Sequence, residues 1–372
     1  MKKRILSILP VLALLSACSG GGSSSGSQPQ IPTAAAGSAN AAVTPYEAKS
    51  DALQVPQPLS VPASTDLLYV GNTSNNSITV YHHDIQGNNA PLYVIAGPNT
   101  GINSPGQLSG DAAGNLYVAN GGLNSSPSIL VFARGANGNV APIRTLAGPA
   151  TGMHHVVAMT VDKTTGKIFV VDDSAPLGQG ANLLRFPPNA GGNEAPFASG
   201  AIYFWGSELA SDSTGKNIIE AHIPSCCHAW SSGIQTLVKQ FTNNATLSPI
   251  YAITAQWDNG VADDPTTETY LVTTPTGIQR FAEDTTGYGP NYGVAASFSP
   301  APSGTITSDT CGTQLAVGYL RNIYVAHGTQ SGCPADAVYV YTHDSSGDAV
   351  PLRVLSGPAT RLNGPYGIYE GT

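Results

Sequence analysis

Charged residues are scarce in this sequence. Asp, Glu, Lys and Arg together make up 10% of the 372 residues, and 15 Lys and Arg are outnumbered by 23 Asp and Glu. Proteins that bind nucleic acid or anionic lipid electrostatically carry clustered basic residues, which this chain lacks beyond its first few positions. We therefore expect no nucleic-acid partner. Low charge with abundant Gly, Ser, Thr and Asn favours an extracytoplasmic all-β protein over a cytosolic enzyme.

The N-terminus lacks an apolar run long enough to span a membrane. Its apolar run covers residues 5–15, whereas a bilayer-spanning helix needs about 20 residues. The basic segment Lys2-Lys3-Arg4 precedes this run, which is the pattern of a secretory signal peptide. The segment Leu15-Ser16-Ala17-Cys18 resembles the lipobox of bacterial lipoproteins, whose cysteine becomes the acylated N-terminus after cleavage.

This resemblance implies a signal peptide over residues 1–18 and acyl chains, palmitate among them, on Cys18. It implies a lipid-anchored location in the bacterial cell envelope. Ser19, in place of Asp, is the outer-membrane signal of enterobacterial lipoproteins. Each buried methylene contributes about 0.8 kcal/mol, so several acyl chains would anchor the chain firmly. The alternative is an ordinary signal peptide followed by a chance cysteine.

Residues 19–64 lack both charge and hydrophobic periodicity. They are rich in Ser, Gly, Ala, Pro and Gln, the composition of a flexible, disordered linker. We expect a tether with a root-mean-square span of roughly 35–40 Å between the lipid anchor and a folded domain over residues 65–372.

The remaining residues contain a repeat. The sequences GNNAPLYVIAGPNTG (87–101), GNVAPIRTLAGPATG (138–152) and GDAVPLRVLSGPATR (347–361) are nearly the same. A β-branched run recurs six times, at 67–72, 116–121, 168–173, 218–223, 270–275 and 323–328. The run after each one ends in an aromatic residue: Tyr81, Phe132, Phe186, Phe241, Phe281 or Tyr341. A proline follows in every unit, at Pro91, Pro142, Pro196, Pro249, Pro290 and Pro351.

Period-two alternation and intervening turn residues predict strands, and each unit forms a four-stranded antiparallel meander. We expect each proline to open the outermost strand, where a missing N–H is tolerated. Such sheets bury both faces only by stacking, which predicts a β-propeller. The first unit lacks its inner strand, and residues 365–370 are placed to supply it. The pattern resembles NHL-repeat six-bladed propellers, and we expect a monomer.

In such a blade, the start of the first strand and the end of the second strand share one face of the propeller. We expect ligand contacts there and in the loop 224–233. The proposed binding residues are Asn72, Asn120, Asp172, Glu208, Trp230, Trp257, Asp258 and Tyr366. The asparagines and aspartate have an alternative role as turn caps.

Histidines on the same face are candidate metal ligands: His154, His155, His222 and His327. The NHL resemblance includes a zinc-dependent lyase and calcium-dependent lactonases, but their ligands find no residue-by-residue match here. The alternative is that these histidines bond neighbouring loops. No G-x-S-x-G motif, P-loop or H-E-x-x-H motif is present.

Cysteines are few, with four beyond Cys18: Cys226, Cys227, Cys311 and Cys333. An even number in an envelope compartment indicates disulfides, and the sequence leaves all three pairings open. Meander geometry places Cys311 after the first strand of its unit and Cys333 after the second, at opposite ends. A redox role for Cys226 and Cys227 is an alternative.

Two functions remain open from the sequence. The first is an envelope lipoprotein whose propeller binds or scaffolds a protein or glycan without chemistry of its own and without a cofactor. The second is a hydrolase or lyase that uses a divalent metal on the same face. Fold alone does not decide between them.

Overall fold

The computed structural model describes residues 66–121, 126–172, 181–202, 205–211, 217–223, 233–238, 249–253, 260–264, 269–274, 276–282, 304–328, 333–334 and 336–371. All belong to one unit, Ser60–Thr372. The predicted signal peptide, the tether, Cys18, Cys226, Cys227, Trp230, Trp257 and Asp258 lie outside these residues. No helix of the described part has the length and hydropathy of a membrane span.

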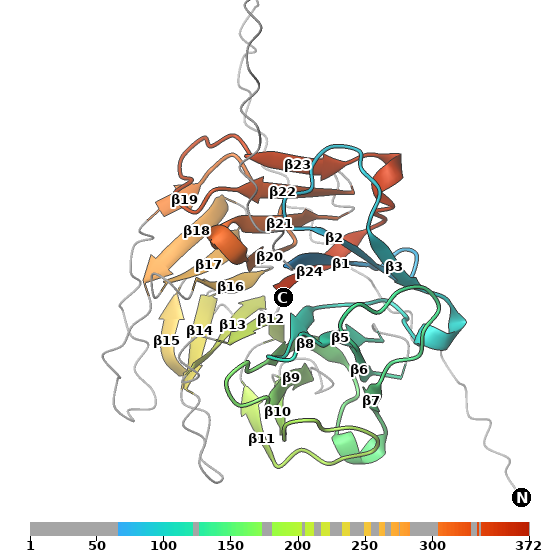
Figure 1. Cartoon of the computed structure of the whole chain (residues 1–372). Helices are drawn as coiled ribbons and strands as arrows, with labels where there is room; N and C mark the ends of the chain where they lie inside the picture. The colour runs from blue at the N-terminus through green and yellow to red at the C-terminus, as the bar shows by residue number, and fades with distance from the viewer. Residues whose placement is uncertain are drawn as a thin grey trace, which may run out of the picture. The chain divides into compact units, whose positions relative to one another are not determined.

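The described strands pair into six four-stranded antiparallel sheets, which we call blades 1–6 (Figure 1). Blade 1 comprises β24 (Pro365–Gly371), β1 (Leu67–Asn72), β2 (Ser77–His82) and β3 (Tyr93–Ala96); blade 2, β4 (Leu108–Gly110), β5 (Leu116–Asn120), β6 (Ser128–Phe132) and β7 (Arg144–Leu146); blade 3, β8 (Val156–Val161), β9 (Ile168–Asp172), β10 (Ala181–Phe186) and β11 (Ala198–Ile202). Blade 4 comprises β12 (Trp205–Ser211), β13 (Asn217–Ile223), β14 (Gly233–Val238) and β15 (Pro249–Ile253); blade 5, β16 (Val261–Asp264), β17 (Thr269–Thr274), β18 (Gly277–Ala282) and β19 (Gly304–Ile306); blade 6, β20 (Gln314–Val317), β21 (Ile323–His327), β22 (Ala337–Tyr341) and β23 (Arg353–Ser356).

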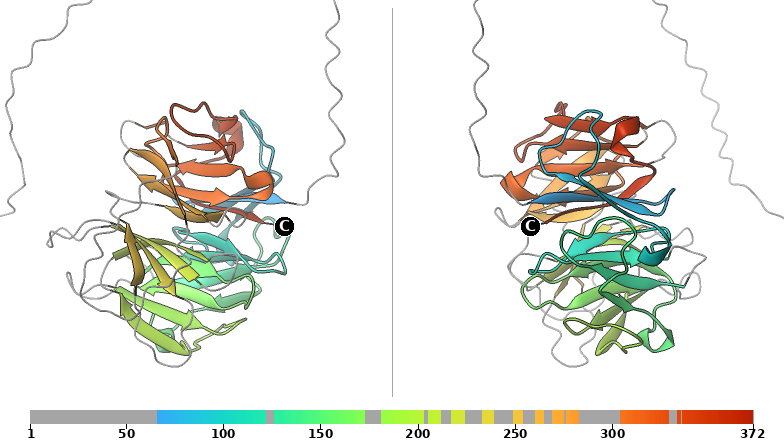
Figure 2. Two further views of the ribbon diagram at one scale, coloured as in Figure 1. Left: turned by 90° about the vertical axis from the view of Figure 1, so that its left-hand side faces the viewer. Right: turned by 45° about the vertical axis from the view of Figure 1, so that its right-hand side comes forward.

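The innermost strands form a closed ring. Strand β24 contacts β4, β4 contacts β8, β8 contacts β12, β12 contacts β16, β16 contacts β20, and β20 contacts β24. The blades radiate from this ring in the face-on view and are stacked side by side in the turned views (Figures 1 and 2). The expectation of an all-β propeller with four-stranded antiparallel blades is confirmed.

The C-terminal strand completes the first blade, as predicted. Strand β24 is antiparallel to β1, and Val70 pairs with Ile368 while Leu67 pairs with Gly371. Ile368 is buried in one cluster with Leu68 and Val70 from blade 1 and with Val338 and Val340 from blade 6. The two ends of the domain are therefore joined in one sheet.

The aromatic residue at the end of the third strand fills the core between blades. Tyr81, Phe132, Phe186 and Tyr341 are all buried. Phe186 lies in a cluster that combines residues of blades 2 and 3. Fully burying a side chain of this size contributes roughly 1.5–3 kcal/mol. The side chain of Phe281 and the residue Phe241 lie outside the described set.

The repeated Gly-Asn pair explains the near-identical segments. In blade 2, Gly138 forms a parallel bridge with Ile95 of blade 1, and Asn139 Oδ1 accepts the Asn99 N–H at 2.7 Å. Asn193 accepts from Ala150 and Asn88 accepts from Ala359, each at 2.7 Å. We call this contact, made by Gly87-Asn88, Gly138-Asn139 and Gly192-Asn193, the Gly-Asn clasp.

The segment that donates its N–H group to the asparagine is a Gly-Pro-x-Thr turn in the neighbouring blade. The short 3-10 helices η1 (Pro98–Thr100), η2 (Pro149–Thr151) and η4 (Pro358–Thr360) each follow a glycine with φ between 108° and 120°. A Cβ on Gly148 would overlap the Asn193 side chain, so both the backbone angle and the close approach require glycine. The repeat is thus a joint between consecutive blades.

Three details differ from the sequence-based expectation. The prolines of blades 1, 2, 3 and 6 lie two residues before the outer strand, and the outer strands of blades 1, 2 and 6 are bridged to a glycine of the next blade. Pro290 does not open β19, which begins at Gly304. In blade 6 the inner strand follows Cys311, because Gln314–Val317 pairs with β21.

Candidate functional site

The inner strands leave a cavity on the propeller axis. Its volume is about 200 Å³, and residues from all six inner strands line it. Ala210, Ala262 and Ala316 leave space where three of the strands converge. The walls are mixed: Leu209 and Ile368 are among the apolar lining residues, and Gln107, Thr160 and Ser211 are among the polar ones.

The cavity lies toward the ends of the inner strands rather than their starts. Lys163 and Thr164, which follow β8, line it together with Asp263 and Glu370 near the ends of β16 and β24. Because second strands run antiparallel to first strands, their ends lie at the other face. The cavity therefore opens away from the face that the sequence indicated.

A buried polar network closes the inner end of the cavity. The Gln107 amide donates to Glu208 Oε1 at 3.2 Å and to the Leu209 carbonyl at 2.5 Å. Its own oxygen accepts from the Met159 and Leu209 N–H groups at 2.8 and 3.1 Å. Glu208 Oε2 accepts from the Val261 N–H at 2.6 Å. Two side chains thus connect blades 2, 3, 4 and 5 at the axis.

Burial governs the protonation of this network. Desolvation raises the pKa of Glu208 well above its usual value, although hydrogen bonds from Val261 and Gln107 oppose this. Burial, with a smaller contribution from Glu208, raises the pKa of Tyr366 to about 12. The inner end of the cavity therefore favours a neutral carboxyl and a neutral phenol.

A lysine and two acidic residues line the outer end of the cavity. The pKa of Lys163 lies below its usual value, because burial lowers it more than the charges of Glu370, Asp66 and Asp263 raise it. The Lys163 ammonium lies 5.3 Å from the ring centroid of Tyr369, within cation–π range. The Lys163 side chain is nevertheless exposed to solvent, while Glu370 is buried.

The predicted residues at the second-strand ends have internal partners. Asn72 Oδ1 accepts from the Asn363 N–H at 2.9 Å, and Asn120 Oδ1 accepts from the Asn103 N–H at 2.7 Å. Asp172 Oδ1 accepts from the N–H groups of His154 and His155. These three side chains are buried and cap the segment that enters the inner strand, the alternative role noted from the sequence.

The candidate metal ligands lie in different surroundings. His154 is exposed, with Nδ1 3.5 Å from Asp172 Oδ2, whereas His327 is buried with Nε2 3.0 Å from Asp309 Oδ2. His155 is half-buried, and the His222 side chain lies outside the described set. Among the described residues, no three His, Cys, Asp or Glu side chains are grouped to hold a metal ion.

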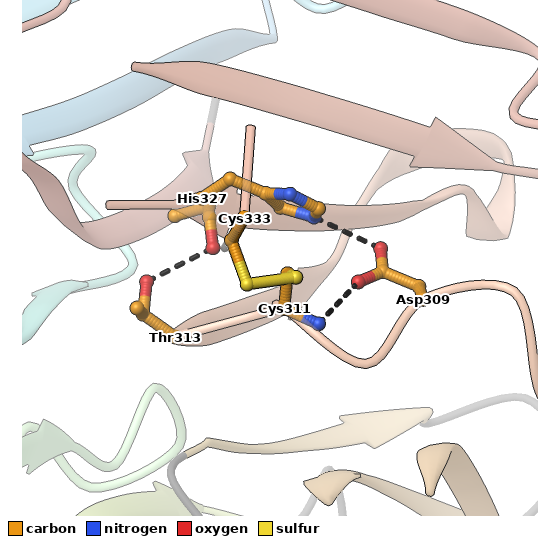
Figure 3. Close-up of a disulfide and its surroundings, with 6 residues drawn as sticks. Asp309, Cys311, Thr313, His327 and Cys333 are labelled. Carbon is orange, nitrogen blue, oxygen red and sulfur yellow. Dashed lines mark hydrogen bonds and ion pairs between the residues drawn. A yellow bond between two sulfur atoms is a disulfide. The ribbon is translucent and has the colours of Figure 1, made fainter. Parts of the chain in front are cut away.

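One disulfide joins Cys311 to Cys333, with Cα atoms 5.7 Å apart (Figure 3). The expectation that they lie at opposite ends of a blade was wrong, because Cys311 precedes the inner strand and the start of that strand meets the end of β21. Asp309 links the pair to His327: its Oδ1 accepts from the Cys311 N–H at 3.2 Å. The His327 ring stacks on Tyr339 with centroids 4.1 Å apart.

Two residues proposed from the sequence lie at or beside the inner end of the cavity: Glu208 lines it, and Tyr366 lies near Glu208. None of the proposed residues lies at its outer end. Lys163, Asp263 and Glu370 were not predicted, because the predicted binding face contained the starts of the first strands and not their ends. The available signal was the charged residues at the ends of three predicted inner strands, in a chain where charge is rare.

Comparisons with known proteins identify the fold. No protein-family model matches the sequence, and no curated protein sequence is significantly similar to it. A chain in the crystal structure of a nidogen/laminin complex has a TM-score of 0.53 and 11% identity, over 82% of this chain and 98% of that one. The periplasmic gluconolactonase PpgL of Pseudomonas aeruginosa has a TM-score of 0.51 and 12% identity, over 82% and 99%. At such identities the likeness shows that this chain has a β-propeller fold.

Proposed function

We propose that this protein is an envelope lipoprotein, anchored through Cys18, whose propeller is a binding module for a protein or glycan. The observation that carries the binding role is the axial cavity, which gathers ionisable and hydroxyl side chains from several blades. The lipobox-like segment and the Ser/Gly-rich tether support the anchored location.

The structural relatives support a binding role and an enzymatic role equally. One is from a complex of nidogen with laminin and the other is a gluconolactonase. We favour binding because the described residues that line the cavity include one basic side chain, Lys163, and none of them is a histidine. A metal-assisted hydrolase or lyase remains the outcome that would replace this proposal.

The binding role is tested with a cavity-filling variant. Ala316 lines the cavity and is partly exposed, so Ala316→Phe is expected to reduce the cavity volume. Because Ala316 also packs against the buried cluster of blades 1 and 6, the variant is first checked for an unchanged melting transition. Ala113→Phe, in an exposed turn, is the matched control. Protein purified from membranes without chelator is assayed on glycan arrays, for defined protein partners, for metal content and for lactone hydrolysis.

The proposal predicts a ligand that the wild-type protein and Ala113→Phe retain and Ala316→Phe loses. A stoichiometric metal together with lactone turnover would overturn it in favour of the enzyme. The anchor is tested separately: Cys18→Ala is expected to move the protein out of the membrane fraction, and unchanged membrane retention would refute acylation at that residue.

A further inference from the structure

Long polar and small residues alternate at one register position around the propeller axis. In blades 2, 4 and 6 the inner-strand residue at this position has a long polar side chain and lies opposite an alanine of the second strand: Gln107, Glu208 and Gln314. In blades 3, 5 and 1 the corresponding residue is small: Ala158, Gly260 and Gly367. Each long side chain is therefore followed around the ring by a blade that leaves room for it.

Two of the three long side chains use this room to bond the next blade. The Gln107 oxygen accepts the Met159 N–H of blade 3 at 2.8 Å, and Glu208 Oε2 accepts the Val261 N–H of blade 5 at 2.6 Å. A Cβ on Gly260 would lie only 2.8 Å from Glu208 Oε2, so the close approach requires glycine.

The third long side chain is left unsatisfied. Gln314 is fully buried, yet neither its Oε1 nor its Nε2 makes a hydrogen bond. Gln314 lowers the pKa of Tyr366, which is the effect of an N–H donor on a phenol. Its Oε1 remains a buried acceptor without a donor, and such an unpaired group costs stability.

Glu208 has the complementary deficiency when it carries a proton. Its two oxygens accept from the Gln107 amide and from the Val261 N–H, and both of these groups are donors. A protonated carboxyl also has one O–H to donate. The hydrogen bonds of Glu208 in the described structure supply no acceptor for this O–H.

Among the described residues, no charged side chain shifts the pKa of Glu208. Burial raises this pKa, and the hydrogen bonds from Val261 and Gln107 lower it. Tyr366 of β24 is the titratable group beside Glu208, and burial keeps its phenol neutral. The charged residues that share the cavity lie at its outer end: Lys163, Asp263 and Glu370.

The backbone brings the unpaired acceptor close to the carboxyl. The point at which a side chain on Gly260 would begin lies 2.8 Å from Glu208 Oε2 and 3.0 Å from the Gln314 Cα. We propose that protonated Glu208 donates its O–H to Gln314 Oε1, and that ionisation of Glu208 breaks this hydrogen bond. The proton thereby links blades 4 and 6 across the axis, and the inner end of the cavity becomes a pH-sensitive contact. This inference does not depend on the proposed binding function.

The first test follows the full-length wild-type protein by NMR between about pH 4 and 9, with labelled glutamate carboxyls and glutamine amides. The signals are assigned by their absence from Glu208→Gln and Gln314→Met. We expect the Gln314 amide signals to shift with the same midpoint as the Glu208 carboxyl, while those of the exposed Gln86 stay constant. A carboxyl that does not titrate in this range, or Gln314 signals that do not follow it, would overturn the inference.

The second test measures the ionisation of Glu208 in Gln314→Met, which keeps the side-chain length and removes the acceptor. A hydrogen bond to the neutral carboxyl opposes ionisation. Its loss is therefore expected to raise the ionisation constant of Glu208 about three- to tenfold, as one hydrogen bond allows. Gln86→Met, in an exposed loop, is the matched control and is expected to leave the constant unchanged.

The sign of this change separates two roles for Gln314. An unchanged ionisation constant in Gln314→Met would show that Gln314 does not hold the proton of Glu208, and a lower constant would show that its amide stabilises the carboxylate instead. If Gln314→Met fails to fold, the wild-type titration decides alone. Neither measurement requires a ligand, so failure of the binding proposal would leave both results standing.

Discussion

The boundaries between blades 6 and 1, 1 and 2, and 2 and 3 share one backbone contact with the boundary between blades 5 and 6, but the side chains around this contact differ. A glycine from the loop of one blade bridges the outer strand of the preceding blade at four boundaries: Gly87 with Leu355, Gly138 with Ile95, Gly192 with Leu146, and Gly347 with Ile306. In three of these an asparagine follows the glycine and completes the Gly-Asn clasp. In the fourth, Asp348 follows, and no Gly-Pro-x-Thr turn receives it.

The boundary between blades 5 and 6 is strengthened by other means. Thr307 N–H donates to the Gly347 carbonyl at 2.7 Å, and then the chain enters the segment of Asp309 and Cys311. There a disulfide and the buried His327–Asp309 pair hold the entry to the inner strand (Figure 3). The comparison teaches that the glycine bridge is common to these four boundaries, while the reinforcing side chains vary.

A third arrangement acts at the axis between blades 4 and 5. Glu208 of blade 4 accepts from the Val261 N–H of blade 5 and from Gln107 of blade 2. Unlike the clasp or the disulfide, this contact contains an ionisable group. The boundaries are therefore expected to differ in their response to truncation, reduction and pH.

Among the changes considered, loss of the closing strand is expected to lower the free energy of unfolding most. Deletion of residues 364–372 removes β24 and exposes the strand edge of β1 and the buried residues around Ile368. Each such side chain contributes about 1.5–3 kcal/mol, so the free energy of unfolding is expected to fall by several kcal/mol. Urea denaturation measures this, and an unchanged midpoint would show that β24 is dispensable.

Loss of the disulfide is expected to have the next largest effect. Cys311 and Cys333 are separated by 22 residues, and cross-linking a loop of that length stabilises by about 3 kcal/mol through the unfolded chain. The double variant Cys311→Ser/Cys333→Ser should lose about that amount. Addition of reductant should destabilise the wild-type protein and leave the variant unchanged; equal sensitivity of both proteins would contradict the assignment.

The axial contact is expected to respond to pH. The pKa of Glu208 is raised in the folded protein, so the folded protein keeps a proton that the unfolded chain has released. Stability from this group is complete below the unfolded pKa and decreases as pH rises toward the folded pKa, by about 1.4 kcal/mol per unit of difference. Glu208→Gln should remove this slope in urea denaturation between pH 5 and 8. A slope identical to that of the wild-type protein would exclude Glu208 as its source.

Loss of one clasp is expected to have the smallest effect. Asn139→Ala removes the acceptor for the Asn99 N–H, a single exposed hydrogen bond of about 1 kcal/mol. Asn193→Ala should behave alike, and the double variant should be additive because the two contacts lie at different boundaries. Asp348→Ala serves as the control at the boundary without a clasp. A loss in this control equal to that in Asn139→Ala would mean that the clasp has no special role.

Local pattern determined the strands, their antiparallel order and the closure of blade 1. Alternation in 67–72 or 323–328 depends only on which face of a strand is buried. The first repeat unit has one strand fewer than the others, which the sequence alone shows. The buried aromatic residues followed from the same repeat. The exception is blade 6, where the short inner strand Gln314–Val317 follows Cys311, whereas the sequence analysis placed Cys311 after the first strand of its unit.

Tertiary structure decided the joints, the disulfide and the site. Asn139 forms its hydrogen bond only because it lies beside the turn of the preceding blade. Cys311 meets Cys333 only because the start of β20 pairs with the end of β21. Lys163, Asp263 and Glu370 are far apart along the chain and meet because β8, β16 and β24 converge on one axis. Period and turn chemistry fix local conformation, whereas a cavity depends on which distant side chains the closed ring brings together.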